Sequence, residues 1–97
     1  MGVQYKLFIY SKHALVKMLE RDISFEETEQ AVCIGEIIKE YPNDKPYKSY
    51  LILAFVETRP LHVVVSNDNE GNCIVISVYE PDRDLWELNF KTKKEKQ

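Results

Sequence analysis

The sequence has few of the residues that build disulfide scaffolds and metal centres. It contains two cysteines and two histidines among 97 residues. Cys33 and Cys73 do not form a Cys-x-x-Cys pair, so their spacing matches neither a zinc site nor a redox motif, and we expect both to be reduced. The histidines lie far apart in the sequence, and no ligand cluster has a recognisable spacing. The sequence therefore predicts neither a metal nor another cofactor.

Long apolar runs are also absent. No run approaches the ~20 residues that a membrane-spanning helix needs. The first ten residues alternate polar and apolar side chains and lack the apolar stretch of a signal peptide. We therefore expect a cytoplasmic protein with no membrane partner. No repeat or Pro/Gly-rich linker divides the chain, which predicts a single domain over residues 1–90 and a basic tail over residues 91–97.

Positive charge is scarce outside the C-terminus. Residues 1–90 carry nine Lys and Arg against fifteen Asp and Glu, a net charge of −6. Residues 91–97 carry four Lys and one Glu, a net charge of +3. An acidic body with a short basic tail gives no general electrostatic footprint for nucleic acid.

Two amphipathic helices are predicted near the N-terminus. Ser11 is a suitable N-cap for a helix that ends near Arg21. Ser24 and Glu27 form a capping box for a second helix, which is expected to end at a left-handed cap on Gly35. The side chains expected to face the core recur at helical spacing. They are Ala14, Leu15, Met18 and Leu19 in the first helix, and Phe25, Thr28, Ala31 and Val32 in the second.

From Glu36 onward the pattern changes from helical to strand-like. The candidate strands are residues 36–41, 50–57, 61–67 and 73–79, and the first ten residues can add a short one. The stretch that follows is irregular, and Trp86 is expected to anchor it to the body. This order predicts an α+β fold, in which the N-terminal helical pair packs on one face of a mainly antiparallel sheet of about four strands.

Alternation of side chains predicts the register of the last two strands. Each is expected to turn one row of apolar side chains to the core: Leu61, Val63 and Val65 in the first, and Ile74, Ile76 and Val78 in the second. Two short connections satisfy this, a four-residue loop at residues 69–72 or a two-residue turn at Gly71-Asn72. His62 then lies directly opposite Tyr79 or on the diagonal, so the two are neighbours on the face away from the core.

The preceding hairpin is expected to bring a cation to the same place. Its first strand is predicted to turn three side chains to the core: Leu51, Leu53 and Phe55. A loop at residues 58–60 then puts Arg59 at the sheet end beside His62 and Tyr79. Ser77 shares the face of that pair.

An imidazole, a guanidinium and a phenol in one place suit the metal-independent cleavage of RNA. His62 can act as general base toward a 2′-OH, and Arg59 can stabilise the charged phosphorane. Tyr79 can serve as the acid or as a stacking platform for an unpaired base. The alternative is a half-buried histidine and tyrosine that hydrogen-bond each other on an ordinary sheet face.

A second group of cations lies on the first helix. His13, Lys17 and Arg21 recur at four-residue intervals and so share a helix face, where they can contact phosphate. The alternative is a solvated face opposite the core stripe. Arg21 is nearest the apolar border and can reach over the sheet edge.

Several short motifs resemble those of a known family. They are His13 at the start of a helix, the Glu20-Arg21-Asp22-Ile23-Ser24 turn, Gly35-Glu36-Ile37-Ile38 with Tyr41-Pro42, Arg59-Pro60-Leu61-His62-Val63-Val64, and Val78-Tyr79-Glu80-Pro81-Asp82 with Trp86. Together they resemble a family of small prokaryotic proteins known only as a domain of unknown function. That family is similar to the BrnT and RelE-like toxins of type II toxin–antitoxin systems. The resemblance covers roughly residues 11–86.

The resemblance implies a RelE-like fold with helices on one sheet face and an open concave face on the other. It also implies an endoribonuclease of the mRNA interferase type, with RNA as substrate and a cognate antitoxin as protein partner. Two alternatives are a non-catalytic protein-binding module on the same fold and an antitoxin-neutralised toxin with another target. Growth arrest on induction that a His62→Ala variant abolishes would favour the enzyme.

Overall fold

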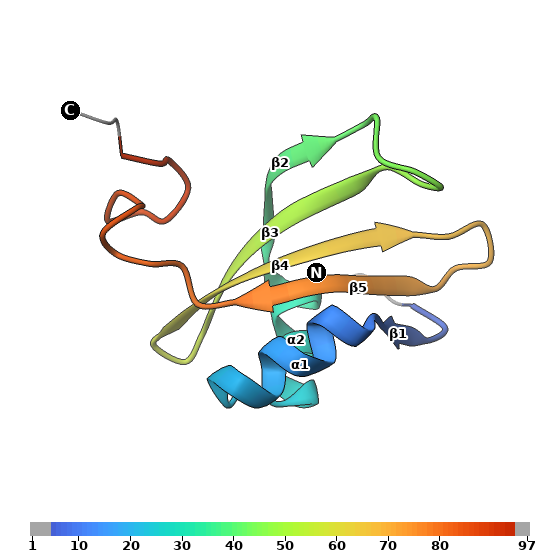
Figure 1. Ribbon diagram of the computed structural model, residues 1–97, viewed down its shortest axis with the longest axis horizontal. Helices are drawn as coiled ribbons and strands as arrows, with labels where there is room; N and C mark the ends of the chain where they lie inside the picture. The colour runs from blue at the N-terminus through green and yellow to red at the C-terminus, as the bar shows by residue number, and fades with distance from the viewer. Residues whose placement is uncertain (1–4, 95–97) are drawn as a thin grey trace.

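Two helices lie on one face of a five-stranded sheet in the computed structural model, which describes residues 5–94 (Figure 1). The elements in chain order are β1 (Phe8–Tyr10), α1 (Lys12–Arg21), α2 (Phe25–Ile34), β2 (Glu36–Tyr41), β3 (Ser49–Val56), β4 (Arg59–Asn67) and β5 (Cys73–Tyr79). The sheet order is β1-β5-β4-β3-β2, with β1 parallel to β5 and the other pairs antiparallel. The α+β class and the helix-covered face are confirmed. The sheet has one strand more than expected, because the short β1 joins its edge.

The helices begin as the sequence predicts. The Ser11 hydroxyl accepts a hydrogen bond from the Ala14 amide, and Ser24 and Glu27 form the complete capping box. The first helix ends at Asp22, which takes the left-handed conformation with φ 56°. The predicted left-handed cap at Gly35 is wrong, because that residue has φ −78° and ψ 176° and already continues into β2.

Gly35 is needed for a close approach of helix and sheet. A Cβ atom there would lie 2.5 Å from the Ala31 carbonyl oxygen and 2.5 Å from Ile52 Cγ2. We expect Gly35→Ala to lower the free energy of unfolding by about 2 kcal/mol, because the backbone of α2 must move away from β3. Denaturant unfolding measures this loss, with the exposed Gln30→Ala of the same helix as control. Equal stability of the two variants would contradict the close approach.

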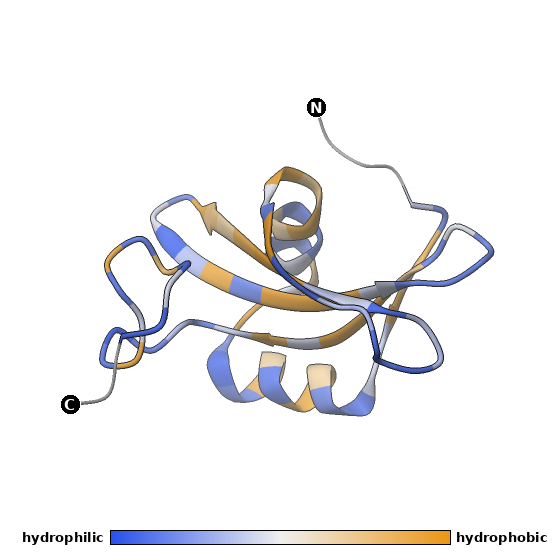
Figure 2. Ribbon diagram, turned by 90° about the horizontal axis from the view of Figure 1, so that it is seen from above, coloured by the Kyte–Doolittle hydropathy of each residue, from blue (hydrophilic) through white to orange (hydrophobic). Residues whose placement is uncertain are grey.

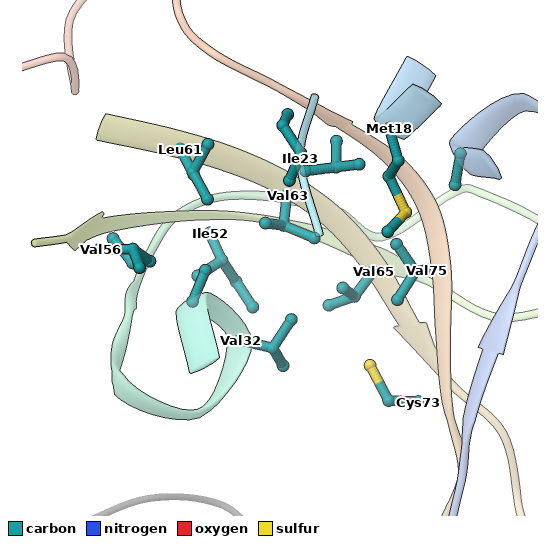
Figure 3. Packing of buried hydrophobic residues seen from close by; sticks show 14 residues of the cluster. Met18, Ile23, Val32, Ile52, Val56, Leu61, Val63, Val65, Cys73 and Val75 are labelled. Atoms are coloured by element: carbon teal, nitrogen blue, oxygen red, sulfur yellow. The ribbon is translucent and has the colours of Figure 1, made fainter. Parts of the chain in front are cut away.

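The main core lies between the helices and the sheet (Figure 3). Leu61, Val63 and Val65 of β4 are at most 1% exposed, which confirms the predicted core face of that strand. His62 therefore points to the opposite face, where it pairs directly with Tyr79. This direct pairing was one of the two that were expected. The connection, however, is residues 68–72 and not the predicted four-residue loop at 69–72, and a bulge in β5 takes up the extra residue.

A β-bulge changes the core face of β5. The register runs from Val63 opposite Val78 to Val65 opposite Val75, which leaves Ile76 without a paired position. Cys73 and Val75 are therefore buried in the core in place of the predicted Ile74 and Ile76. Because of the bulge, the predicted core face of β5 is correct only at Val78, near the end of the strand.

Strand β3 turns its other face to the helices. A two-residue turn at Glu57 and Thr58, with Glu57 at φ 60°, replaces the predicted loop. Leu53 consequently pairs with His62. The residues that enter the main core are Ile52, Ala54 and Val56. The prediction for Leu51, Leu53 and Phe55 was therefore wrong, since the shorter turn moves every side chain to the opposite face.

The two helices are less buried than their apolar patterns predict. Helix α1 packs on β5, whereas α2 packs on β3 and β4, and Figure 2 shows the helices well apart. Ala14 and Met18 are buried, but Leu15 is 42% exposed and Leu19 is 86% exposed. On α2, Phe25 is 53% exposed. Because the helices cover different strands, they do not bury each other's flanks.

A second, smaller core covers part of the opposite sheet face. Residues 80–94, here called the C-terminal segment, continue from the end of β5 (Figure 1). Trp86 and Phe90 of this segment pack on Leu51 and Leu53 of β3. The anchoring role expected of Trp86 is confirmed, and the expected open face is closed here by irregular chain. The segment turns back on itself through the Trp86–Lys93 bridge, while residues 95–97 of the predicted basic tail lie outside the described part of the chain.

Candidate functional site

A cleft of ≈ 840 Å³ lies between helix α1 and the C-terminal segment. One wall is the solvent-facing side of α1, with His13, Lys17 and Arg21. Its floor is the end of β5, with Ser77 and Tyr79, and its other wall is formed by residues 80–86 together with Lys93. We call it the α1 cleft. It gathers all four of the secondary site residues predicted from the sequence, together with Tyr79.

The cleft exists because strand β1 is short. It pairs with β5 only as far as Val75, and the chain then turns into α1 as the Ser11 amide donates to the Val75 carbonyl oxygen. The Ser11 hydroxyl donates to the next carbonyl, that of Ile76, at 2.8 Å. From there on, α1 and the C-terminal segment flank the end of β5, and no described strand covers that edge. Side chains from all three elements therefore meet.

The cationic wall follows one face of α1. Its three basic side chains are four residues apart, which separates them by about 6 Å along the helix axis. Lys17 forms an ion pair with Glu20 at 3.5 Å, a surface pair that contributes little to stability. His13 and Arg21 are exposed, and neither forms a side-chain ion pair with another residue of the described range. The wall can therefore receive an anion without first breaking a strong interaction.

His62 lies behind this site and not in it. Its side chain is 0% exposed, beneath Trp86, whose ring centroid lies 4.5 Å from that of the imidazole. Nε2 lies 2.7 Å from the Phe90 carbonyl oxygen, and Nδ1 lies 3.2 Å from the Tyr79 hydroxyl. A carbonyl only accepts, so Nε2 carries the hydrogen and Nδ1 accepts from Tyr79. Burial lowers the pKa of His62.

The predicted role of His62 as general base therefore has no geometric support. A base must lie within hydrogen-bond reach of the proton that it removes. Both ring nitrogens of His62 are already engaged by protein groups, and the ring has no exposed surface. We assign it instead as a positioning residue, which holds the Tyr79 hydroxyl and the C-terminal segment in place.

Tyr79 keeps its place in the site. It pairs with His62, as predicted, and its half-buried ring lines the floor of the cleft. Burial raises the pKa of the Tyr79 hydroxyl, so the phenol stays protonated at neutral pH. Its proton is directed to His62, which leaves the ring face as the part that a ligand can use.

Arg59 points to the other side of the sheet. It lies two residues before Leu61 and so shares the helix-facing side of β4, where its side chain cannot join His62. Its Nε donates to Glu80 at 2.5 Å, and its Nη1 forms an ion pair with Glu27 at 3.2 Å. Nη1 also donates to the carbonyl oxygen of Asp22, and Nη2 donates to that of Arg21.

The predicted position of Arg59 beside His62 is therefore wrong, and its predicted role as a phosphate clamp there has no geometric support. The hydrogen bond to Glu80, opposed by partial burial, raises the pKa of Arg59. Its donors tie the turn between the helices to the end of β5. This network fixes the C-terminal end of α1 and with it the backbone of Arg21, the last cation of the cleft wall.

Some residues of the cleft were not predicted as site residues. Trp86 was expected only as an anchor, but it also lines the cleft, with the Lys93 ammonium 5.8 Å from its ring centroid. The wall opposite α1 carries both signs of charge: Glu80, Asp82 and Asp84 against Arg83 and Lys93. Irregular chain has no period from which such a wall could be inferred. The proximity of Trp86 to the Tyr79-Glu80-Pro81-Asp82 motif was the only available signal.

The fluorescence of Trp86 should report the protonation of His62. Burial lowers the pKa of His62, so a proton binds more tightly when the segment is detached. The packing of the C-terminal segment over His62 is therefore most favourable above about pH 6.5, the ordinary pKa of a histidine. It weakens as the pH falls below that value. We expect the emission of Trp86, the one tryptophan of the chain, to shift to the red between pH 7 and pH 5. His13→Ala should keep this transition and His62→Gln should lose it; the same transition in both would contradict the assignment.

Two further observations concern residues 5–94. No helix in this range has the length and apolarity needed to cross a bilayer. Within the same range, no three His, Cys, Asp or Glu side chains gather in the manner of metal ligands.

The chain matches a known protein family. A family model described as a domain of unknown function, DUF4258, matches residues 10–80. The matched range includes both helices, the cationic wall and the floor of the α1 cleft, and it ends at Glu80. No curated protein and no solved structure matches the chain.

Proposed function

Because the chain belongs to the DUF4258 family of domains of unknown function, we propose its activity from the cleft: a toxin-like, metal-independent endoribonuclease that cuts single-stranded RNA there. The observation that carries the proposal is the α1 cleft, which is lined by three basic side chains and by two aromatic residues, Tyr79 and Trp86. The arrangement of two helices on one face of the sheet is also consistent with a RelE-like fold, as the toxin family would require.

The cationic wall supports binding of the RNA backbone. Lys17 and Arg21 supply positive charges about 6 Å apart along α1, a spacing comparable to the step between successive phosphates of an extended strand. The Arg21 guanidinium can bind two phosphate oxygens at once. Such a local contact does not require a basic protein.

The aromatic floor supports binding of unpaired bases. Tyr79 lies on the floor of the cleft, and the largely buried Trp86 lines the wall that continues from it. Single-stranded RNA is commonly recognised by stacking of its bases on aromatic side chains, and duplexes cannot offer their bases in this way. A cleft lined by a cation row and by two aromatic residues therefore suits one strand with its phosphates on α1 and its bases on the floor.

His13 takes the base role that His62 cannot fill. In this mechanism the exposed imidazole of His13 accepts the 2′-OH proton, and the 2′ oxygen bonds to the adjacent phosphorus. The bond from phosphorus to the 5′ oxygen breaks, and Lys17 protonates that oxygen. Arg21 stabilises the charged phosphorane. The products are a 2′,3′-cyclic phosphate and a 5′-hydroxyl end.

Incubation of the purified chain with single-stranded RNA in EDTA tests this function. We expect cleavage with cyclic phosphate ends, and no cleavage where a 2′-deoxy nucleotide replaces the attacked position. A toxin would also have a cognate antitoxin, so growth arrest on induction should be relieved by a protein encoded beside it. Intact RNA under all conditions would contradict the endoribonuclease.

A second candidate function is a non-catalytic protein-binding module. It is favoured by the net charge of −3 and by the three carboxylates on the cleft wall, which repel phosphate. In that case the chain would neither cut nor bind RNA, and the cleft would accept a protein segment with cationic side chains.

A further inference from the structure

A second concave surface lies on the other side of helix α1. It has a volume of ≈ 490 Å³ and is lined mainly by apolar side chains from the two helices and their turn. These are Leu15, Met18, Leu19, Ile23 and Phe25, with Asp22, Ser24, Glu27 and Arg59 as the polar members. We call it the α1–α2 groove. It shares no lining residue with the α1 cleft.

The groove exposes side chains that the sequence pattern marks for burial. Leu15 and Leu19 belong to the apolar stripe of α1, and Phe25 begins the buried side of α2. Leu19 is among the most exposed large apolar residues of the described chain. Isolated exposed leucines are ordinary, but several around one concavity mark an interaction surface.

The walls of the groove restrict what can fill it. One wall is α1, and the other is the turn at residues 22–24 with the first turn of α2. The strand residue that lines the groove, Arg59, belongs to the inner strand β4, so an added β-strand would find no open strand edge there. A helix can instead insert side chains between the two ridges, using apolar residues at positions i, i+3 or i+4, and i+7. The occupant that fits is therefore an amphipathic helix.

The charge around the groove selects the flanks of that helix. Asp22 lines the groove, Glu26 follows Phe25 on α2, and neither has an ion-pair partner among the described residues. Glu27 is neutralised by Arg59. The unpaired rim is thus acidic, as is the body of the chain, and it attracts cationic side chains.

We propose that the α1–α2 groove is a docking site for an amphipathic helix of another protein, with leucine-like residues on its inner face and lysine or arginine on its flanks. The proposal does not rest on the endoribonuclease activity, because the groove and the cleft lie on different sides of α1. A partner seated in the groove would leave the cleft open to RNA.

A synthetic helix provides the test. The probe is a fluorescein-labelled peptide of about four turns, with leucines at helical spacing and lysines on both flanks. One control peptide has glutamate in place of every lysine, and another has the same composition with the leucines out of phase. Fluorescence anisotropy measures the Kd of each peptide for the full chain. The groove variant is Leu19→Ala with Phe25→Ala, and the matched control is Leu88→Ala, an exposed leucine outside the groove.

We expect the lysine-flanked helix to bind, and the groove variant to bind it at least about tenfold more weakly. Leu88→Ala should bind it like the parent chain, and both control peptides should bind poorly. Equal binding by the groove variant, equal binding of the glutamate-flanked helix, or no binding would each overturn the proposal. Self-association of the parent chain that the groove variant abolishes would also overturn it, because the occupant would then be a second copy.

Discussion

His13→Ala is expected to cleave RNA at least about 100-fold more slowly than the parent chain, because a positioned general base commonly contributes that much to the rate. Arg21→Ala should cause a loss of similar size through the phosphorane charge. Both residues are exposed on the surface of α1, so neither change should affect folding. Initial rates on a labelled single-stranded RNA measure the effect.

Lys12→Ala is the matched control for these variants. Lys12 is an exposed cation of the same helix, next to His13, but it does not line the α1 cleft. Its removal changes the net charge by the same amount as Arg21→Ala and should leave the rate unchanged. If Lys12→Ala were as damaging as Arg21→Ala, general attraction and not the cleft would explain the activity.

Trp86→Ala is expected to detach the C-terminal segment. The indole packs edge-on against His62 and belongs to the smaller core with Leu51 and Leu53. Removal of a buried Trp side chain commonly costs about 3–5 kcal/mol, which is a large part of the stability of a small domain. In this protein the lost stability should first affect the C-terminal segment, because Trp86 does not belong to the main core on the helix side of the sheet.

Hydrogen exchange with mass spectrometry locates that loss. In Trp86→Ala, the amides of residues 85–94 should exchange much faster, while those of β4 remain protected. RNA cleavage should fall as well, since the segment forms a wall of the cleft. Leu88→Ala, at an 87% exposed position of the same segment, is the control. Uniform loss of protection over the whole chain would instead make Trp86 part of one cooperative core.

Local signals explain the parts of the fold that the sequence predicted. Ser11 and Ser24 each precede a helix and bond its first turn, as capping requires. In strand β4 the apolar residues Leu61, Val63 and Val65 occupy alternate positions, so their shared core face was predictable, and so was the outward direction of His62. The contact of His62 with Tyr79 followed from this alternation of side chains and from a short connection between β4 and β5.

The same alternation would have placed Arg59 correctly. Residues 59 and 61 are two positions apart in one strand, so the side chain of Arg59 must lie with Leu61 on the helix side of the sheet, opposite to His62. Proximity along the sheet end was mistaken for proximity on one face. This error was avoidable from the sequence.

Other differences depend on the tertiary structure. The bulge at Ile76 and the two-residue turn after Val56 each move side chains to the opposite face, and neither has a strong local signal. Leu15 and Leu19 are exposed because α1 and α2 lie over different strands. His62 is covered by the C-terminal segment, whose irregular sequence has no periodicity from which its position could be predicted. The sequence therefore could not distinguish an accessible general base from a buried structural histidine.

The most direct test of the α1 cleft as the functional site is an NMR titration of the full chain with a non-cleavable 2′-O-methyl oligonucleotide. We expect the largest shift changes at His13, Lys17, Arg21, Ser77, Tyr79 and the Trp86 indole, all of which line the cleft. Leu19 and Phe25 in the α1–α2 groove should not respond. Shift changes confined to the groove or to the β2 edge, or no changes at all, would contradict the account.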